Sequence, residues 1–417
     1  MMVAVRRGRH LGIAVIVAAL GLVAAMPAAP TASAATAKNV YTPVLAVLVA
    51  PNDPAPVLGT DRKYHVLYEL RLSNRGPIPA TLQKLEVLDA DSGAVVESFE
   101  GTDLQTRVRD IGGVAASSTS IEPGGERLFM VDLAFGLSLN VPLALEHRLQ
   151  LLGPKSPRAA AATAVTYRVA TVPLDGPAPP VLVPPLRGNG WVVTRGCCDI
   201  SNPDRTPILP VNGGLWSPLR FSIDMMQLDD GGLFVHDDPT VLGNYTGYGA
   251  DVLAVAPGKV VGVLNTLPDQ VAGAPPDPTS GFESADGNSI VIDLGNGTFA
   301  FYGNLQPGSL LVNVGDHVQR RQVLATLGNS GDSSYPHLSF RLMSGSSPFG
   351  SDGVPFVFNA FSYEGQLDAE RYASEGVTAN YLEDRVQNPI PVRRELPLGF
   401  AIIDFGTPGG AGAVGRT

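Results

Sequence analysis

The sequence contains little cysteine, little histidine and few charged side chains. Two cysteines and six histidines occur among its 417 residues, and 16% of the residues are charged. Two cysteines cannot supply the four ligands of a structural zinc site. The 29 lysines and arginines are outnumbered by 39 aspartates and glutamates, which gives a net charge of −10. Because nucleic-acid binding depends on basic side chains that neutralise phosphates, this acidic balance argues against a nucleic-acid partner.

The two cysteines are adjacent, at Cys197 and Cys198 in the stretch RGCCDI. Free thiols tend to oxidise outside the cytosol. In an exported protein the pair is therefore compatible with three states: a vicinal disulfide, two buried thiols, or a bridge to another chain.

Long apolar runs are confined to the N-terminus. Residues 11–25 form an apolar run, three arginines precede it, and Ala-Ser-Ala at residues 32–34 offers small residues for cleavage. This pattern predicts a secretory signal peptide over residues 1–34, and so a secreted or cell-envelope protein without a membrane span after cleavage. A retained membrane anchor is the alternative, although the run is short for a spanning helix. Cleavage would remove three arginines and no acidic residue, so the net charge would fall to −13.

The abundant residues indicate β structure. The chain has 47 glycines and 36 prolines, and its hydrophobic patterns mostly have a period of two. These features predict a turn-rich, all-β fold. The alternating stretch YHVLYELRLSN, with Tyr68 on one face and Glu69 on the other, indicates an immunoglobulin-like β-sandwich without the cysteine pair of antibody domains. The predicted order is signal peptide 1–34, sandwich 40–172, stiff proline-rich linker 173–188, second β domain 189–405 and flexible tail 406–417.

Turn residues divide the second domain into strands. Pro257 with Gly258, and Asn296 with Gly297, each predict a hairpin between two apolar runs. Residues 265–286 form a long insertion rich in proline, glycine and aspartate, and loops of this length often wall a functional site. The alternating stretch ELPLGFAIIDFG near the C-terminus predicts one more strand that packs back on the sheet.

Five phrases of the second domain occur in the order of a known family. RFSID, GYGADVLAVAPGKVV, GNSIVIDLGNGTFAFYGNL, VGDHVQRRQVLATLGNSG and PHLSF resemble the lysostaphin/LytM-type zinc peptidases, metallopeptidase family twenty-three, over roughly residues 210–345. Together with the signal peptide and the sandwich, the chain resembles exported actinobacterial members. The resemblance implies an antiparallel β-sheet with a narrow groove in which peptide cross-links of peptidoglycan are cleaved.

The resemblance also implies a set of site residues. In the family, a histidine, an aspartate four residues later and the second histidine of a His-x-His phrase bind zinc, which activates a water. Here Asp224 matches the aspartate, whereas Arg220 and Ser339 replace the two histidine ligands. His337 stands at the general-base position, and Asn304 replaces the accessory histidine.

These replacements predict a degenerate, non-catalytic member. A catalytic zinc has three protein ligands, a serine hydroxyl is a poor ligand, and an arginine brings positive charge to a cation site. We therefore expect no cofactor, and a binding or regulatory protein whose partner is a peptidoglycan peptide or an envelope protein. One alternative is an active zinc metalloendopeptidase with substitute ligands, for which His236 is the one histidine near in sequence. A structural envelope scaffold that acts through the sandwich is the other.

The predicted groove is lined by polar residues. It comprises Arg220, Asp224, Tyr302, Asn304, His337 and Ser339. If residues 220–224 form a strand, Arg220 and Asp224 share a face and can pair, so that arginine supplies the charge of the metal. The alternative is an ordinary exposed arginine. Tyr245 and Tyr248 are either further groove residues or packing residues.

Ser339, His337 and Asp224 together also have the composition of a nucleophilic triad. Side chains two apart on a strand do not generally bring a hydroxyl against an imidazole, so this interpretation is a minor one.

Overall fold

The computed structural model describes residues 39–49, 54–137, 141–275 and 281–406. The predicted signal peptide, and the predicted tail beyond residue 406, lie outside the described residues. Within this part of the chain, no helix has the length and apolarity needed to cross a membrane. Backbone contacts join the described residues from Tyr41 onwards into one compact unit.

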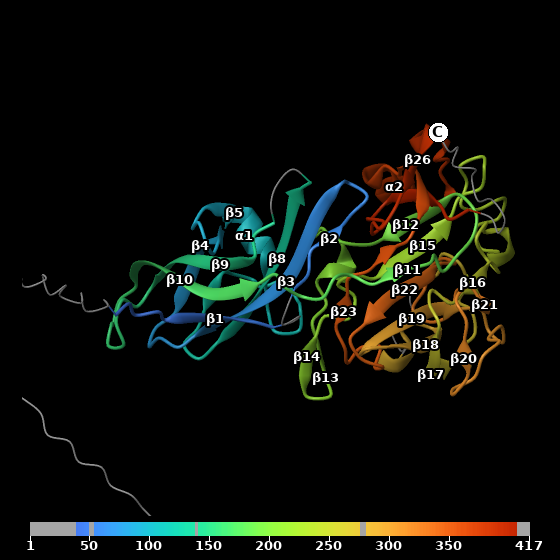
Figure 1. The fold of residues 1–417 in the computed structure, drawn as a ribbon. Coiled ribbons are helices and arrows are strands. Elements are labelled where there is room, and N and C mark those ends of the chain that lie inside the picture. The colour runs from blue at the N-terminus through green and yellow to red at the C-terminus, as the bar shows by residue number, and fades with distance from the viewer. Residues whose placement is uncertain (1–38, 50–53, 138–140, 276–280, 407–417) are drawn as a thin grey trace, which may run out of the picture. The chain divides into compact units, whose positions relative to one another are not determined.

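Two five-stranded antiparallel sheets form the N-terminal part (Figure 1). The first has the order β1-β3-β8-β6, with β2 beside β3, and comprises β1 (Val44–Leu48), β2 (Val57–Leu58), β3 (Lys63–Asn74), β6 (Val108–Arg109) and β8 (Glu126–Gly136). The second has the order β10-β9-β4-β5, with β7 beside β4, and comprises β4 (Ala80–Asp89), β5 (Val95–Glu100), β7 (Ser120–Ile121), β9 (Ala144–Gly153) and β10 (Thr163–Pro173). Inward residues such as Tyr68, Leu70 and Leu85 are fully buried in a core that both sheets share.

An eleven-stranded antiparallel sheet forms the C-terminal part, in the order β20-β17-β18-β19-β22-β15-β12-β27-β25-β26 with β23 beside β22 (Figure 1). Its strands are β12 (Trp191–Arg195), β15 (Ile223–Gln227), β17 (Gly258–Leu264), β18 (Asn288–Gly295), β19 (Thr298–Leu305), β20 (His317–Val318), β22 (Leu338–Met343), β23 (Gly353–Val354), β25 (Phe361–Gln366), β26 (Arg385–Val392) and β27 (Ala401–Asp404). The all-β prediction is confirmed, and β27 is the predicted C-terminal strand, because it pairs with β12 and β25.

Short elements complete the fold. Two-stranded sheets pair β11 (Val181–Leu182) with β24 (Val357–Phe358), β13 (Leu209–Val211) with β14 (Gly214–Trp216), and β16 (Asp251–Leu253) with β21 (Val323–Thr326). The helices are α1 (Gly101–Arg107) and α2 (Ala369–Glu375), and the 3-10 turns are η1 (Pro203–Arg205), η2 (Leu242–Asn244), η3 (Phe282–Ser284), η4 (Gly376–Thr378) and η5 (Leu382–Asp384).

The two predicted hairpins have different outcomes in the structure. The hairpin at Asn296 and Gly297 is present, since β18 pairs with β19 and both turn residues have the positive φ that such turns require. The hairpin at Pro257 and Gly258 is not, because β16 pairs with β21 while β17 pairs with β18 and β20.

Residues 173–188, expected to be a linker, are packed into the fold. Strand β11 pairs with β24, Val183 and Leu186 are buried, and Leu186 belongs to the core of the C-terminal part.

The outer face of β3 is also buried. Leu67 belongs to the core of the C-terminal part, and Glu69 is 0% exposed. A carboxylate is rarely buried to this degree unless it is paired. Its partners come from the C-terminal part and are described with the site below.

Candidate functional site

Four of the predicted site residues line one pocket of about 450 Å³: Asp224, Asn304, His337 and Ser339. Asp224 lies on β15 directly opposite Ser339 on β22, and Ser339 in turn pairs with Gly303 on β19. The neighbours of Ser339 on its strand, Leu338 and Phe340, are buried in the core, so the serine faces the pocket. The strand periodicity and register thus bring these polar residues together.

Hydrogen bonds fix the side chains of Asn304 and His337 in the pocket. Asn304 adopts φ of 59°, a conformation that asparagine tolerates, and its side-chain Nδ2 donates to the Ser330 carbonyl at 2.9 Å. The Nδ1 of His337 lies 2.8 Å from the Tyr335 carbonyl. Because a carbonyl oxygen can only accept, we assign the ring hydrogen to Nδ1. The Nε2 of His337 lies 3.8 Å from Oδ2 of Asp224.

Arg220 does not belong to the pocket, so the predicted Arg220–Asp224 pair is wrong. Residues 217–222 form a turn before β15 begins, and the alternation that would align Arg220 with Asp224 is broken there. Nor is it an exposed arginine, since it is 1% exposed. Its Nε and Nη2 atoms donate to the two carboxylate oxygens of Glu69 at 3.2 and 2.5 Å, and Asp352 lies 3.8 Å away.

Glu69 also binds a second buried arginine. Nη1 of Arg205 lies 2.5 Å from Oε1 of Glu69, and Nη2 donates to the Val131 carbonyl at 2.9 Å. Burial by itself would raise the pKa of Glu69, but the charges of Arg220 and Arg205 outweigh it and hold that pKa below its usual range. One carboxylate of the sandwich therefore fixes the backbone near both pocket-lining segments, 203–205 and 217–222.

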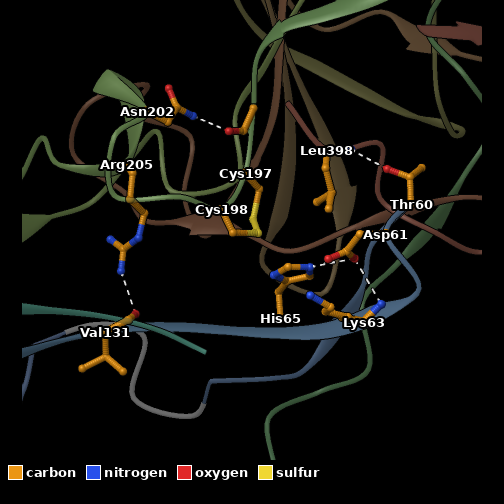
Figure 2. The surroundings of a disulfide bond; sticks show 11 residues. Thr60, Asp61, Lys63, His65, Val131, Cys197, Cys198, Asn202, Arg205 and Leu398 are labelled. Atoms are coloured by element: carbon orange, nitrogen blue, oxygen red, sulfur yellow. Dashed lines mark hydrogen bonds and ion pairs between the residues drawn. A yellow bond between two sulfur atoms is a disulfide. The ribbon is translucent and has the colours of Figure 1, made fainter. Parts of the chain in front are cut away.

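A disulfide between Cys197 and Cys198 lies in the loop that precedes the first of these segments (Figure 2). It faces His65 of the sandwich, and the side chain of Asn202 donates to the Gly196 carbonyl across the loop (Figure 2). The cysteines, His65 and neighbouring loop residues line a second pocket of about 570 Å³, which shares Thr194 and Arg195 with the first. Of the three states left open by the sequence, the structure contains the vicinal disulfide.

The tyrosines of the predicted groove pack elsewhere. Tyr302 is fully buried, and its hydroxyl accepts a hydrogen bond from the Val255 amide at 2.9 Å. Tyr245 donates to the Pro239 carbonyl, and Tyr248 donates to Asp269. The expected place of Tyr302 in the groove is therefore wrong, because its face of β19 points into the core.

Neither a nucleophilic triad nor a substitute ligand is assembled here. Among the described residues, no hydrogen bond joins the Ser339 hydroxyl to His337, whose Nδ1 is bonded to Tyr335. His236 is about half exposed, lies 3.2 Å from Asp229 and does not line the pocket.

Sequence reasoning missed several pocket residues. Asp204 lies in η1, directly before Arg205, and its carboxylate lies 3.5 Å from Arg195. Asp286 ends the predicted insertion and pairs with Arg341. The one local signal for Asp204 is Asn202, whose side chain accepts from the Asp204 amide and so starts the turn.

The pocket is rich in negative charge. Burial, and then the charge of Asp224, raise the pKa of Asp204 to about 7 from 3.8, although Arg195 and Arg341 oppose the shift. Asp286 adds a further negative charge that acts in the same direction as Asp224.

The raised pKa of Asp204 predicts how Asp204→Asn changes the free energy of unfolding. The unfolded chain loses the Asp204 proton near pH 4 and the folded chain near pH 7, so the native carboxyl costs stability as pH rises through this window. We expect Asp204→Asn to raise the free energy of unfolding by about 2–4 kcal/mol at about pH 8 and to change it little at about pH 4. Urea unfolding at both pH values checks this, and an equal effect at both would contradict it.

The pocket does not fit a catalytic zinc. Such a site has three protein ligands and an open position. The residues at the family positions offer the carboxylate of Asp224 and the hydroxyl of Ser339, while Arg220 is engaged by Glu69. Across the described ranges, no group of three histidine, cysteine, aspartate or glutamate side chains is arranged to hold a metal.

Comparison with known proteins identifies part of this region. Residues 244–350 match Peptidase family M23, so this part of the chain is an M23 peptidase domain. The match includes Asn304, His337 and Ser339, whereas Arg220 and Asp224 precede it. No curated protein matches the chain in sequence.

Solved structures with similarity to the chain include M23 peptidases. The catalytic domain of lysostaphin from Staphylococcus simulans is 20% identical with a TM-score of 0.21, over 40% of this chain and 84% of that chain. A mutant catalytic domain of the prophage-encoded M23 protein EnpA from Enterococcus faecalis is 20% identical with a TM-score of 0.20, over 29% and 83%. A putative M23 peptidase from Pseudomonas aeruginosa is 15% identical with a TM-score of 0.23, over 75% and 94%.

Proposed function

We propose that this chain, which carries an M23 peptidase domain, is an exported cell-envelope protein that binds peptidoglycan peptide in its pocket without cleaving it. The observation that carries the proposal is the exchange of imidazole at three family positions. Ser339 and Asn304 stand in the pocket where histidines are expected, and Arg220 is withdrawn into an ion pair with Glu69.

The features of the pocket that remain favour binding. The family pair Asp224 and His337 is retained, and aromatic side chains of Tyr335, Phe349 and Tyr372 line the same space. Pockets with apolar walls and a few converging polar groups are typical of ligand sites. Export is supported by the signal-peptide pattern over residues 1–34.

Co-sedimentation of the full chain with purified peptidoglycan sacculi tests this function. We expect the protein to sediment with the sacculi and to release no soluble peptide, with or without added zinc. Release that requires zinc and stops on addition of a chelator would contradict the proposal and favour an active peptidase. If the protein failed to sediment, the proposal would be contradicted, and a structural envelope scaffold that acts through the sandwich would be favoured.

A matched pair of variants ties the binding to the pocket. Ser339→Leu narrows the pocket with an apolar side chain and should reduce the bound fraction several-fold. Ser374→Leu makes the same change at an exposed position of α2 and should bind as the unchanged chain does. Equal binding by both variants would place the ligand elsewhere.

A further inference from the structure

We infer that the pocket recognises a primary ammonium group on its ligand, through Asp224 and Asp204. This inference rests on the proposed function, since it assigns the chemistry of the ligand at the same site. It arises from an imbalance of charge in the pocket, which four aspartates line against one arginine, Arg195.

Asp224 is the clearest case. The residue is 9% exposed, and its carboxylate accepts no hydrogen bond from any described side chain or amide. The Nε2 of His337 lies 3.8 Å from this carboxylate, which is too far for a hydrogen bond. A nearly buried carboxylate that receives no hydrogen bond leaves a place for a donor group of a ligand.

The buried hydroxyl of Ser222 points independently to a ligand. Ser222 lines the pocket and is 1% exposed, and its hydroxyl lacks a hydrogen-bond partner within the described structure. Buried polar groups are nearly always paired, so an orphaned hydroxyl beside an acidic pocket indicates a missing polar partner. The Oδ1 atom of Asn304 is a further acceptor, because the Nδ2 atom of this amide is bonded to Ser330.

A primary ammonium has the chemistry to satisfy this set. It carries three donors and a positive charge, and it does not require the fixed ligand geometry that a metal does. Asp204 adds a second carboxylate, which is balanced in part by Arg195, a side chain that is 55% exposed. Met226 and Tyr372 provide apolar walls for the methylene groups of an alkylammonium stem.

Chemical acetylation of the amines in sacculi tests the inference. We expect the full chain to bind untreated sacculi at least about tenfold more tightly than acetylated sacculi, because acetylation removes the charge. Equal binding to both would overturn the inference and leave the proposed function standing. Failure to bind either would overturn both.

Charge variants assign the effect to these carboxylates. Asp224→Asn and Asp204→Asn should each weaken binding to untreated sacculi by about tenfold and become insensitive to acetylation. Asp204→Asn is expected to stabilise the fold, so its loss of binding cannot be ascribed to unfolding. Asp91→Asn removes the same charge from an exposed turn of the sandwich and should change binding less than about threefold. If Asp224→Asn and Asp204→Asn kept full sensitivity to acetylation, the amine would be recognised elsewhere.

Discussion

Glu69→Gln is expected to lower the free energy of unfolding of the full chain by about 3–5 kcal/mol. The reason is that Arg205 and Arg220 are 1% exposed and would both lose the carboxylate that pairs with them. Breaking a buried ion pair by removing one partner leaves an uncompensated charge in a medium that solvates it poorly. Denaturant unfolding followed by circular dichroism measures the effect.

The control is Glu146→Gln, which makes the same change in a surface pair. Arg168, its partner at 2.8 Å, is about half exposed, so the loss should stay below about 1 kcal/mol. If Glu69→Gln lowered the free energy of unfolding no more than this control, the account would be wrong. The buried ion pairs of Glu69 with Arg205 and Arg220 would then not hold the sandwich against the C-terminal part.

The second large effect is expected when histidine is restored at positions 220 and 339, where the family has zinc ligands. The double variant Arg220→His, Ser339→His is expected to remain without stoichiometric zinc and to be destabilised by about 3–5 kcal/mol. Position 220 lies in the turn before β15 and its side chain is directed to Glu69, so an imidazole there does not join Asp224 in the pocket. The stability falls because Glu69 loses its bidentate partner.

Metal analysis after dialysis against zinc, together with denaturant unfolding, checks the double variant. Ser339→His alone is the control, since it keeps the Arg220–Glu69 pair and should unfold close to the unchanged chain. Stoichiometric zinc in the double variant, without loss of stability, would show that position 220 still reaches the pocket.

The strands, and the convergence of four polar residues on one pocket, could be predicted because they follow local rules. Alternation placed Ser339 opposite the core residues Leu338 and Phe340, and the Asn296–Gly297 pair marked the β18–β19 hairpin. Such patterns depend on neighbours in the sequence and need no knowledge of distant contacts.

The place of Arg220 could not be predicted in this way. Its partner Glu69 lies 151 residues away, and the turn at 217–222 interrupts the alternation on which the predicted Asp224 pair depended. Alternation in the sequence shows which residues share a face of β3. It does not show that the C-terminal part covers the face that carries Glu69. The single hint was Leu67, an apolar residue on the same face as Glu69.

Asp204 was missed for a related reason. The acidic character of the pocket comes from segments that no periodic pattern links, the turn η1 and the end of the insertion at Asp286. Arg205 is bound to Glu69, and its neighbour Asp204 lines the pocket. The sandwich therefore contributes to the site indirectly, through the backbone that it holds.

The central claim is that the pocket binds peptidoglycan peptide and holds no catalytic metal. The zinc content of the full chain tests this claim most directly. We predict that protein purified without chelator contains far less than one zinc per chain, and that added zinc brings no release of peptide from sacculi. One zinc per chain, removable by a chelator together with peptide release, would contradict the account.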